Sequence, residues 1–280
     1  MERSAISIRA LREAGMSIGP HTIIDPKRPI AAFHGRCALA VMAKAPKAGN
    51  VKTRLSPPLN SHQAAALNIA FLRDTIACLK EVTAATEAHV VISYTPVGEE
   101  ANFAGIVPCD VPLVPQRGDC FGERLRYTTE DLFAAGFSAV CLIDSDSPTV
   151  PTGVYEEAVG QLLANEDCAV LGPSDDGGYY LIGVNASHPR LFEDITWSTA
   201  VVAEQTRQRA QEIDLPLYSL PTWFDVDDHQ TLARLYRDLV ICDSGRAGFA
   251  ATHTRDYLRT IRDQLDEMSM AAIAGHGAQQ

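Results

Sequence analysis

Short, continuous apolar runs recur along this chain, separated by longer segments with helical periodicity. The clearest run covers residues 37–43, Cys-Ala-Leu-Ala-Val-Met-Ala, in which no charged residue interrupts the apolar side chains. Such a run is typical of a strand in a parallel sheet whose two faces are both covered by helices. Further strands are predicted at residues 89–94, 112–115, 138–143, 168–172, 179–184 and 216–220.

Helices are predicted between these strands. Asn60 or Ser61 can cap a long amphipathic helix that extends to about residue 82. Strands that alternate with helices through short connections predict an α/β domain with a mostly parallel sheet flanked by helices. The other helices are predicted at residues 121–136, 152–165 and 199–213 and directly after residue 228.

The predicted domain covers residues 37–240. Residues 1–36 contain several arginines but no continuous apolar segment, so they are predicted to be a polar N-terminal extension and not a secretory signal. Residues 241–280 are predicted to form a C-terminal extension, with a helix at 251–269 and a frayed tail.

Charge and cysteine content exclude several classes of protein. The net charge of −11 argues against binding to the nucleic-acid backbone, which requires clustered Lys and Arg. No apolar stretch approaches the roughly 20 residues that span a membrane. The 7 cysteines are scattered without a C-x-x-C spacing, which favours reduced thiols and a cytoplasmic location. A nucleotide ligand remains compatible with this negative net charge, because local cations and a divalent metal can offset the charge of its phosphates.

A basic loop follows the first predicted strand, at the sheet edge where ligands of α/β proteins bind. Arg54 can grip a phosphate through two hydrogen bonds, and a glycine allows the backbone to approach a ligand closely. This is not a Walker A loop, because Gly49 is separated from Lys52 by two residues. A solvated loop is the plain alternative, but the position favours phosphate binding. The predicted nucleotide-binding residues are Lys44, Gly49, Lys52, Thr53 and Arg54.

Acidic residues follow two other predicted strands. Asp144 and Asp146 come after the strand at 138–143, and Asp225 and Asp227 follow a strand-like stretch near residue 220. Hard cations such as Mg²⁺ and Mn²⁺ take one or two carboxylates together with phosphate oxygens. These four residues are therefore the candidate metal ligands. An Asx-turn is an equally simple role for Asp144 and Asp146. Asp227 or Asp228 could instead cap the helix that follows.

Three weaker candidates complete the set. Asp175 and Asp176 precede Gly177 and Gly178 between two strands, where an acid could act as a general base and the glycines could admit a substrate. A plain turn explains this segment equally well. Trp197 is predicted to be core or pocket wall, and Gln116, followed by Arg117, to lie near a nucleotide base.

The motifs occur in a familiar order across residues 39–235: AKAP-x-x-G-x-VKTRL, Q-x-G-x-x-x-GER, D-S-P, GP-x-x-DGGYYL-x-G, WST and DVD. The chain resembles a bacterial family of GT-A-like glycosyltransferases, some linked to arsenosugar biosynthesis, within the nucleotide-diphospho-sugar transferase superfamily. The resemblance implies that superfamily's Rossmann-like fold, and metal binding by Asp146, Asp225 and Asp227. Because the family more often has Gly-Thr-Asp before Ser-Pro, Asp146 is a stronger candidate than Asp144.

The resemblance implies a transferase that uses a nucleotide-sugar and a small-molecule acceptor. In that interpretation Lys52 and Arg54 hold phosphates, and Asp176 activates the acceptor. The first alternative is a nucleotidyltransferase that releases pyrophosphate from an NTP, since Lys-Thr-Arg-Leu also resembles the loop of phospholactate and phosphoenolpyruvate guanylyltransferases. Such enzymes usually carry a Gly-rich loop after the first strand, whose absence favours sugar transfer. The second alternative is a catalytically silent nucleotide-binding protein.

Overall fold

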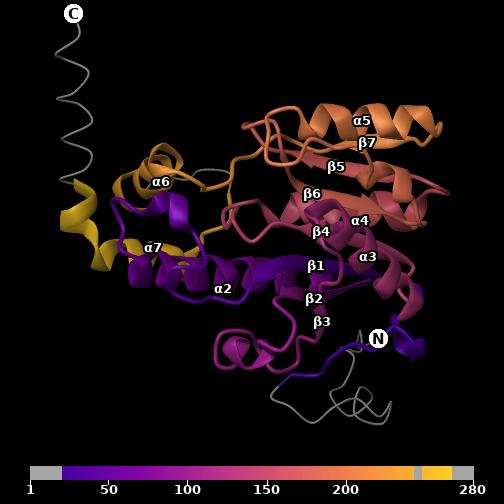
Figure 1. Ribbon diagram of the computed structural model, residues 1–280, viewed down its shortest axis with the longest axis horizontal. Helices are drawn as coiled ribbons and strands as arrows, with labels where there is room; N and C mark the ends of the chain where they lie inside the picture. Colours follow the sequence, from indigo (N-terminus) through magenta and orange to yellow (C-terminus); the bar gives the residue numbers. More distant parts are fainter. Residues whose placement is uncertain (1–20, 243–247, 267–280) are drawn as a thin grey trace, which may run out of the picture.

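In the part of the chain that the structure describes, seven strands form one central sheet in the order β3-β2-β1-β4-β6-β5-β7. The computed structural model describes residues 21–242 and 248–266. In Figure 1 the strands stack from β3 at the bottom to β7 at the top. The predicted α/β class with a mostly parallel sheet is confirmed. The strands are β1 (Cys37–Lys44), β2 (Ala88–Thr95), β3 (Leu113–Pro115), β4 (Ala139–Ile143), β5 (Ala169–Pro173), β6 (Tyr179–Val184) and β7 (Leu217–Ser219).

The apolar run that defines β1 lies at the middle of this sheet. Strand β1 pairs in parallel with both β2 and β4. Strand β6 is the exception, because it runs antiparallel to β4 and β5. A parallel pair needs a crossover of about a dozen residues, and the short connection between β5 and β6 permits a hairpin instead.

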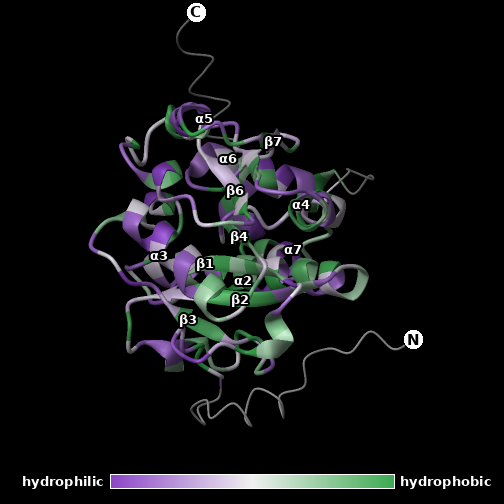
Figure 2. Ribbon diagram, turned by 90° about the vertical axis from the view of Figure 1, so that its right-hand side faces the viewer, coloured by the Kyte–Doolittle hydropathy of each residue, from purple (hydrophilic) through white to green (hydrophobic). Residues whose placement is uncertain are grey.

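Helices cover both faces of the sheet, which explains the uninterrupted apolar strands. One apolar cluster joins strand residues such as Leu39 and Val41 to α2 and α4, and the other joins Ala38 and Ala40 to α3 and α5. Figure 2 shows the hydrophobic colour concentrated on the central strands. The helices are α2 (Ser61–Ala85), α3 (Phe121–Ala134), α4 (Thr152–Ala164), α5 (Val202–Glu212), α6 (His229–Tyr236) and α7 (Thr252–Thr260).

Helix ends agree with the sequence at one position and differ at another. The Asn60 side chain accepts hydrogen bonds from the backbone of His62 and Gln63, so Asn60 caps α2 as predicted. The helix predicted at about residues 199–213 is present, but α5 begins later, at Val202. The Thr199 hydroxyl donates to the Thr196 carbonyl in the turn before it.

The segment before β1 packs onto the sheet. Residues 21–36 were expected to belong to a polar extension, but Ile24, Ile30 and Phe33 are buried in the cluster that contains α3 and α5. Ile23 forms a parallel bridge with Leu113. The domain division at residue 36 stays a prediction, and the part of the extension at residues 1–20 lies outside the described residues.

The C-terminal helices α6 and α7 lie with α2 beside the loop that follows β1 (Figure 1). Leu258 of α7 and Leu232 of α6 are buried in one cluster with Leu55 and Phe71. The buried carboxylate of Asp74 on α2 accepts hydrogen bonds from the backbone N–H groups of His253 (3.0 Å) and Thr254 (2.7 Å). Of the helix predicted at 251–269, α7 covers Thr252–Thr260 and ends there, which is earlier than predicted. Residues 267–280 lie outside the described chain.

No helix among the described residues has the length and apolar character needed to cross a bilayer.

Candidate functional site

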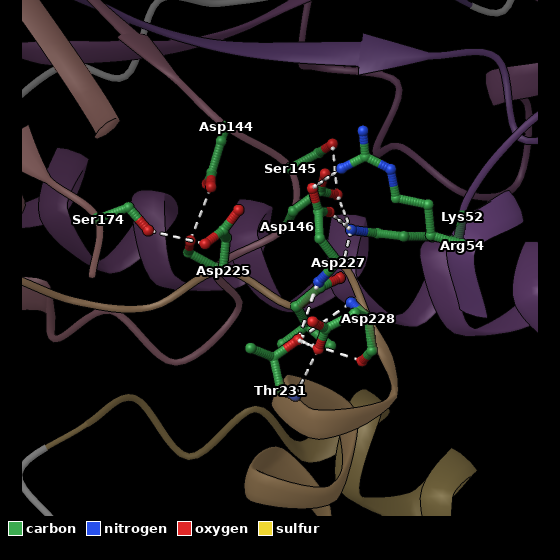
Figure 3. A network of polar contacts seen from close by, with 12 residues as sticks. Lys52, Arg54, Asp144, Ser145, Asp146, Ser174, Asp225, Asp227, Asp228 and Thr231 are labelled. Atoms are coloured by element: carbon green, nitrogen blue, oxygen red, sulfur yellow. Dashed lines mark hydrogen bonds and ion pairs between the residues drawn. The ribbon is translucent and has the colours of Figure 1, made fainter. Parts of the chain in front are cut away.

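Three segments that are distant in sequence meet beyond the ends of β1 and β4. They are the basic loop after β1, the acidic segment after β4 and residues 223–228 after β7. Figure 3 shows their side chains in one network of polar contacts. The backbone N–H of Val226 donates to the Asp146 carbonyl oxygen at 3.0 Å, which fixes the second and third segments to each other. The predicted basic and acidic motifs therefore form one site.

Lys52 lies at the centre of this network (Figure 3). Its side chain is 4% exposed, and Nζ lies 2.9 Å from Asp146 Oδ1 and 3.0 Å from Asp227 Oδ1. Nζ also donates to the Val226 carbonyl oxygen at 2.7 Å, so its three N–H groups each have an acceptor. The backbone of Lys52 is left-handed, with φ of 50°, which few non-glycine residues adopt.

The two carboxylates keep Lys52 charged. Burial acts to lower the pKa of the Lys52 ammonium, but Asp146 and Asp227 outweigh it, and the pKa is raised above its ordinary value. Lys52 therefore holds two predicted metal ligands together. The prediction that its ammonium contacts a ligand phosphate stays a prediction.

A pocket of about 230 Å³ opens beside this network. Arg54, whose side chain is 71% exposed, lines it with Lys44, Thr53 and Asn68. Ligand pockets usually measure about 300–1,000 Å³, so this volume suits the phosphate portion of a ligand better than a whole nucleotide. Asn68 was not predicted. It is 7% exposed on the buried side of α2, and a polar residue among apolar helix positions was its available signal.

Gly49 lies outside the lining of this pocket. Its φ is +82°, and a Cβ at this position would meet no atom within 4 Å. Glycine is therefore needed at position 49 for the positive φ of the turn. It is not needed to let other atoms approach closely.

Two further carboxylates lie next to the Lys52 network. Asp225 accepts a hydrogen bond from the Ser174 hydroxyl at 2.7 Å, and Asp144 Oδ2 accepts one from the Ser147 hydroxyl at 2.7 Å. Asp144 Oδ1 is buried without a hydrogen-bond partner. Burial, followed by the charges of Asp146 and Asp225, raises the pKa of Asp144 well above its ordinary value. Burial also raises the pKa of Asp225.

These carboxylates fit a hard cation in their chemistry. Among the described residues, no group of three His, Cys, Asp or Glu side chains is already arranged to hold a metal. Mg²⁺ needs one or two carboxylates when phosphate oxygens and water complete its shell. The unpartnered Oδ1 of Asp144 and the all-oxygen donor set agree with a cation that arrives together with a phosphate ligand.

Asp228, and not Asp227, caps the helix that follows. The Asp228 carboxylate accepts hydrogen bonds from the backbone of Gln230 and Thr231 at the start of α6. This leaves the Asp227 carboxylate to Lys52 and, at 3.8 Å, to Arg54. The sequence left the cap open between Asp227 and Asp228, and the structure assigns it to Asp228. The role of Asp227 as a metal ligand stays a prediction.

The predicted substrate-binding segment forms the turn between β5 and β6. Asp175 pairs with Arg234 at 2.6 Å, and Asp176 Oδ1 accepts from the backbone N–H of Gly178 at 2.8 Å. The carbonyl of Gly177 accepts from Ala203 N, and the Gly177 backbone packs directly against Ala200. Gly177 therefore makes room for another stretch of the chain itself. The substrate contacts predicted for this segment stay predictions.

Replacing Gly177 with alanine should destabilise the protein strongly. A Cβ at Gly177 would lie 2.0 Å from the Ala200 carbonyl oxygen, whereas a Cβ at Gly49 would meet nothing. Both glycines have positive φ, so the backbone strain of either substitution should lower the free energy of unfolding by about 1–2 kcal/mol. Urea unfolding should give a further loss of at least about 2 kcal/mol for Gly177→Ala alone. Equal losses in the two variants would contradict the packing described for Gly177.

Gln116 and Trp197 lie outside the lining of the 230 Å³ pocket. The buried Gln116 amide donates to the Ser93 carbonyl oxygen at 2.8 Å, and Arg117 pairs with Asp131. Trp197 packs edge-to-face on Phe121, with ring centroids 5.1 Å apart. The structure thus gives each of them a packing or bonding role outside this pocket, and their predicted ligand contacts stay untested.

Comparisons with known proteins agree with this fold. A structure from Desulfovibrio desulfuricans G20, provisionally named a nucleotide-diphospho-sugar transferase, shares 29% identity with a TM-score of 0.72, covering 84% of this chain and 98% of that one. The structure of CMP:2-keto-3-deoxy-manno-octonic acid synthetase complexed with CTP shares 11% sequence identity, with a TM-score of 0.49. The match covers 75% of this chain and 100% of that one. That second similarity is too weak to carry a functional argument.

The comparison with protein families matches a shorter part of the chain than the structure comparison does. A family model described as an uncharacterized protein conserved in bacteria (DUF2064) matches residues 78–199. None of the curated proteins matches the chain. The fold is therefore that of the nucleotide-diphospho-sugar transferases, and the activity is a matter for proposal.

Proposed function

We propose that this chain is a metal-dependent glycosyltransferase that moves a sugar from a nucleotide-sugar to a small-molecule acceptor. The observation that carries the proposal is the contact of Lys52 with Asp146 and Asp227, beside a small pocket lined by further cations. The similar structure from D. desulfuricans, named for this type of transferase, supports it. Membership of the GT-A-like family that the motifs resemble is part of the same proposal.

Each residue of the site then has a role. Arg54 and Lys44 bind diphosphate oxygens from the exposed side of the pocket, and the planar guanidinium of Arg54 can donate two hydrogen bonds at once. Lys52 positions the Asp146 and Asp227 carboxylates. Mg²⁺ or Mn²⁺, held by Asp146 with Asp225 or Asp227, would supply positive charge for the departing nucleoside diphosphate.

Asp176 is the proposed base that accepts the acceptor's proton. It is exposed, and its charge helps to raise the pKa of Asp225, which indicates that it lies near the carboxylate cluster. We assign the reaction to the cytoplasm, where the free thiols of all seven cysteines would remain reduced.

A thermal-shift panel with product analysis tests this function. Nucleotide-sugars with Mn²⁺ or Mg²⁺ should stabilise the protein more than either component alone, followed by slow release of a nucleoside diphosphate. Release of pyrophosphate from an NTP with a phosphorylated acceptor would instead establish nucleotidyl transfer. Stabilisation without any turnover would identify a silent nucleotide-binding protein, and the absence of any shift would reject nucleotide binding.

A further inference from the structure

A second pocket, of about 510 Å³, lies between residues 222–224, α6 and the start of α7. Its wall includes the aromatic rings of Trp223, Phe224 and Phe249 and the guanidinium groups of Arg234 and Arg255. We call it the aromatic pocket. Its volume falls within the range of about 300–1,000 Å³ that is usual for small-molecule sites. Among the described residues, it shares no lining residue with the pocket beside Lys52.

The two arginines of the aromatic pocket differ in their partners. Arg234 is neutralised by Asp175 at 2.6 Å, and its guanidinium lies 3.8 Å from the centre of the Phe224 ring. Arg255 has no ion pair within the described chain, and its Nε is buried without a hydrogen-bond partner. Asp238 also lies in the lining. Arg255 thus lines the pocket with a charge that no carboxylate of the described chain pairs, and an anionic ligand would supply that partner.

The remaining wall favours an apolar body on that ligand. Trp223 and Phe224 are stacked, with ring centroids 6.1 Å apart and planes inclined by 22°. Phe249 is partly buried against the main apolar core. Flat aromatic walls bury planar or apolar groups at little entropic cost, because the rings are already fixed.

The aromatic pocket adjoins the carboxylate site through shared segments. Phe224 in its wall is followed directly by Asp225. Asp175, also in its wall, lies between Ser174, which donates to Asp225, and Asp176, the proposed base. A ligand in the aromatic pocket would therefore lie against residues that are directly bonded in sequence to the proposed catalytic residues.

We propose that the aromatic pocket binds the acceptor, and that the acceptor is an anionic small molecule with an apolar body, its carboxylate or phosphate placed at Arg255. The role of this ligand as the acceptor rests on the function proposed above. The binding of an apolar anion at Arg255 is independent of that function.

Isothermal titration of the full-length protein with four probes tests this assignment. Phenyl phosphate and benzoate carry an aromatic ring and an anion, benzyl alcohol lacks the anion, and inorganic phosphate lacks the ring. We expect phenyl phosphate or benzoate to bind at least tenfold more tightly than benzyl alcohol and inorganic phosphate. The tighter of the two identifies the anionic group. Equal affinity for benzyl alcohol, or no binding of either aromatic anion, would overturn the proposal.

Variants locate the bound probe. Arg255→Gln should weaken the tighter probe at least tenfold, and Arg255→Lys should weaken it less because the charge remains. Arg259→Gln, on the exposed side of the same helix, is the matched control and should bind normally. Circular dichroism verifies that each variant is folded. Undiminished binding to folded Arg255→Gln, or loss of binding in Arg54→Met instead, would place the probe elsewhere and reject the assignment.

Failure here can be separated from failure of the proposed function. If a nucleotide-sugar stabilises the protein while no aromatic anion binds, the aromatic-pocket assignment alone is wrong. If an aromatic anion binds in an Arg255-dependent manner while no nucleotide does, the pocket assignment stands and the proposed function fails.

Discussion

Replacing Lys52 with methionine should lower turnover at least a hundredfold and lower the free energy of unfolding by about 1–3 kcal/mol. Methionine fills a similar volume but leaves Asp146 and Asp227 facing each other without their shared cation. The Val226 carbonyl oxygen would also lose its donor from Lys52. We place the stability loss below that of a fully buried ion pair, because the two carboxylates are 31% and 44% exposed.

Arg54→Met is the matched control in the same loop. Arg54 is largely exposed and lies 3.8 Å from Asp227, so its loss should change stability by less than about 0.5 kcal/mol. It should nevertheless weaken binding of the nucleotide-sugar, which chemical denaturation and titration together would resolve. If Lys52→Met retained both stability and turnover, the central position given to Lys52 would be wrong.

Replacing Asp74 with alanine should destabilise the protein by about 2–4 kcal/mol. The Asp74 carboxylate is buried on α2 and accepts from two backbone N–H groups at the first turn of α7. Alanine would leave both donors without this acceptor, and the N–H of Thr254 is buried. The loss should also reach the site, because α7 supports the apolar cluster that contains Leu55 of the basic loop.

Urea unfolding and hydrogen exchange measure this effect. The amides of His253 and Thr254 should exchange much faster in Asp74→Ala, whereas Asp74→Asn should lose less because its side chain keeps one acceptor oxygen. Asp256→Ala on the exposed side of α7 is the control, with an expected change below about 0.5 kcal/mol. A small loss for Asp74→Ala would show that packing alone holds α7 on α2.

The strands were the most predictable part of this fold. A run such as residues 37–43 has no polar face, so it can be stable only between two covering layers. The antiparallel direction of β6 was not predicted, although the short connection after β5 permits no parallel crossover. The packing of Ile24, Ile30 and Phe33 was also missed, because three separated apolar residues in a polar segment form no periodic pattern.

The charged residues of the candidate site were predictable from the sequence, but their pairing was not. Position after a strand brought the basic loop and the two acidic segments to the same edge of the sheet. The direction of Lys52 depends on its left-handed backbone, which nothing in its residue type indicates. Similarly, Asp228 caps α6 and Asp227 pairs with Lys52. The sequence Asp-Val-Asp-Asp alone does not indicate which of the two aspartates caps the helix.

The bond from Lys52 to the Val226 carbonyl joins positions 174 residues apart in sequence. During synthesis the basic loop therefore leaves the ribosome long before the segment that completes its contacts. A nascent chain can pair β1 with β2 and β4 and still carry Lys52 without Asp227. Contacts of such long range form slowly, because the closure entropy of the intervening chain must be overcome first. Catalytic competence would thus be acquired late, and a product truncated before β7 could not acquire it.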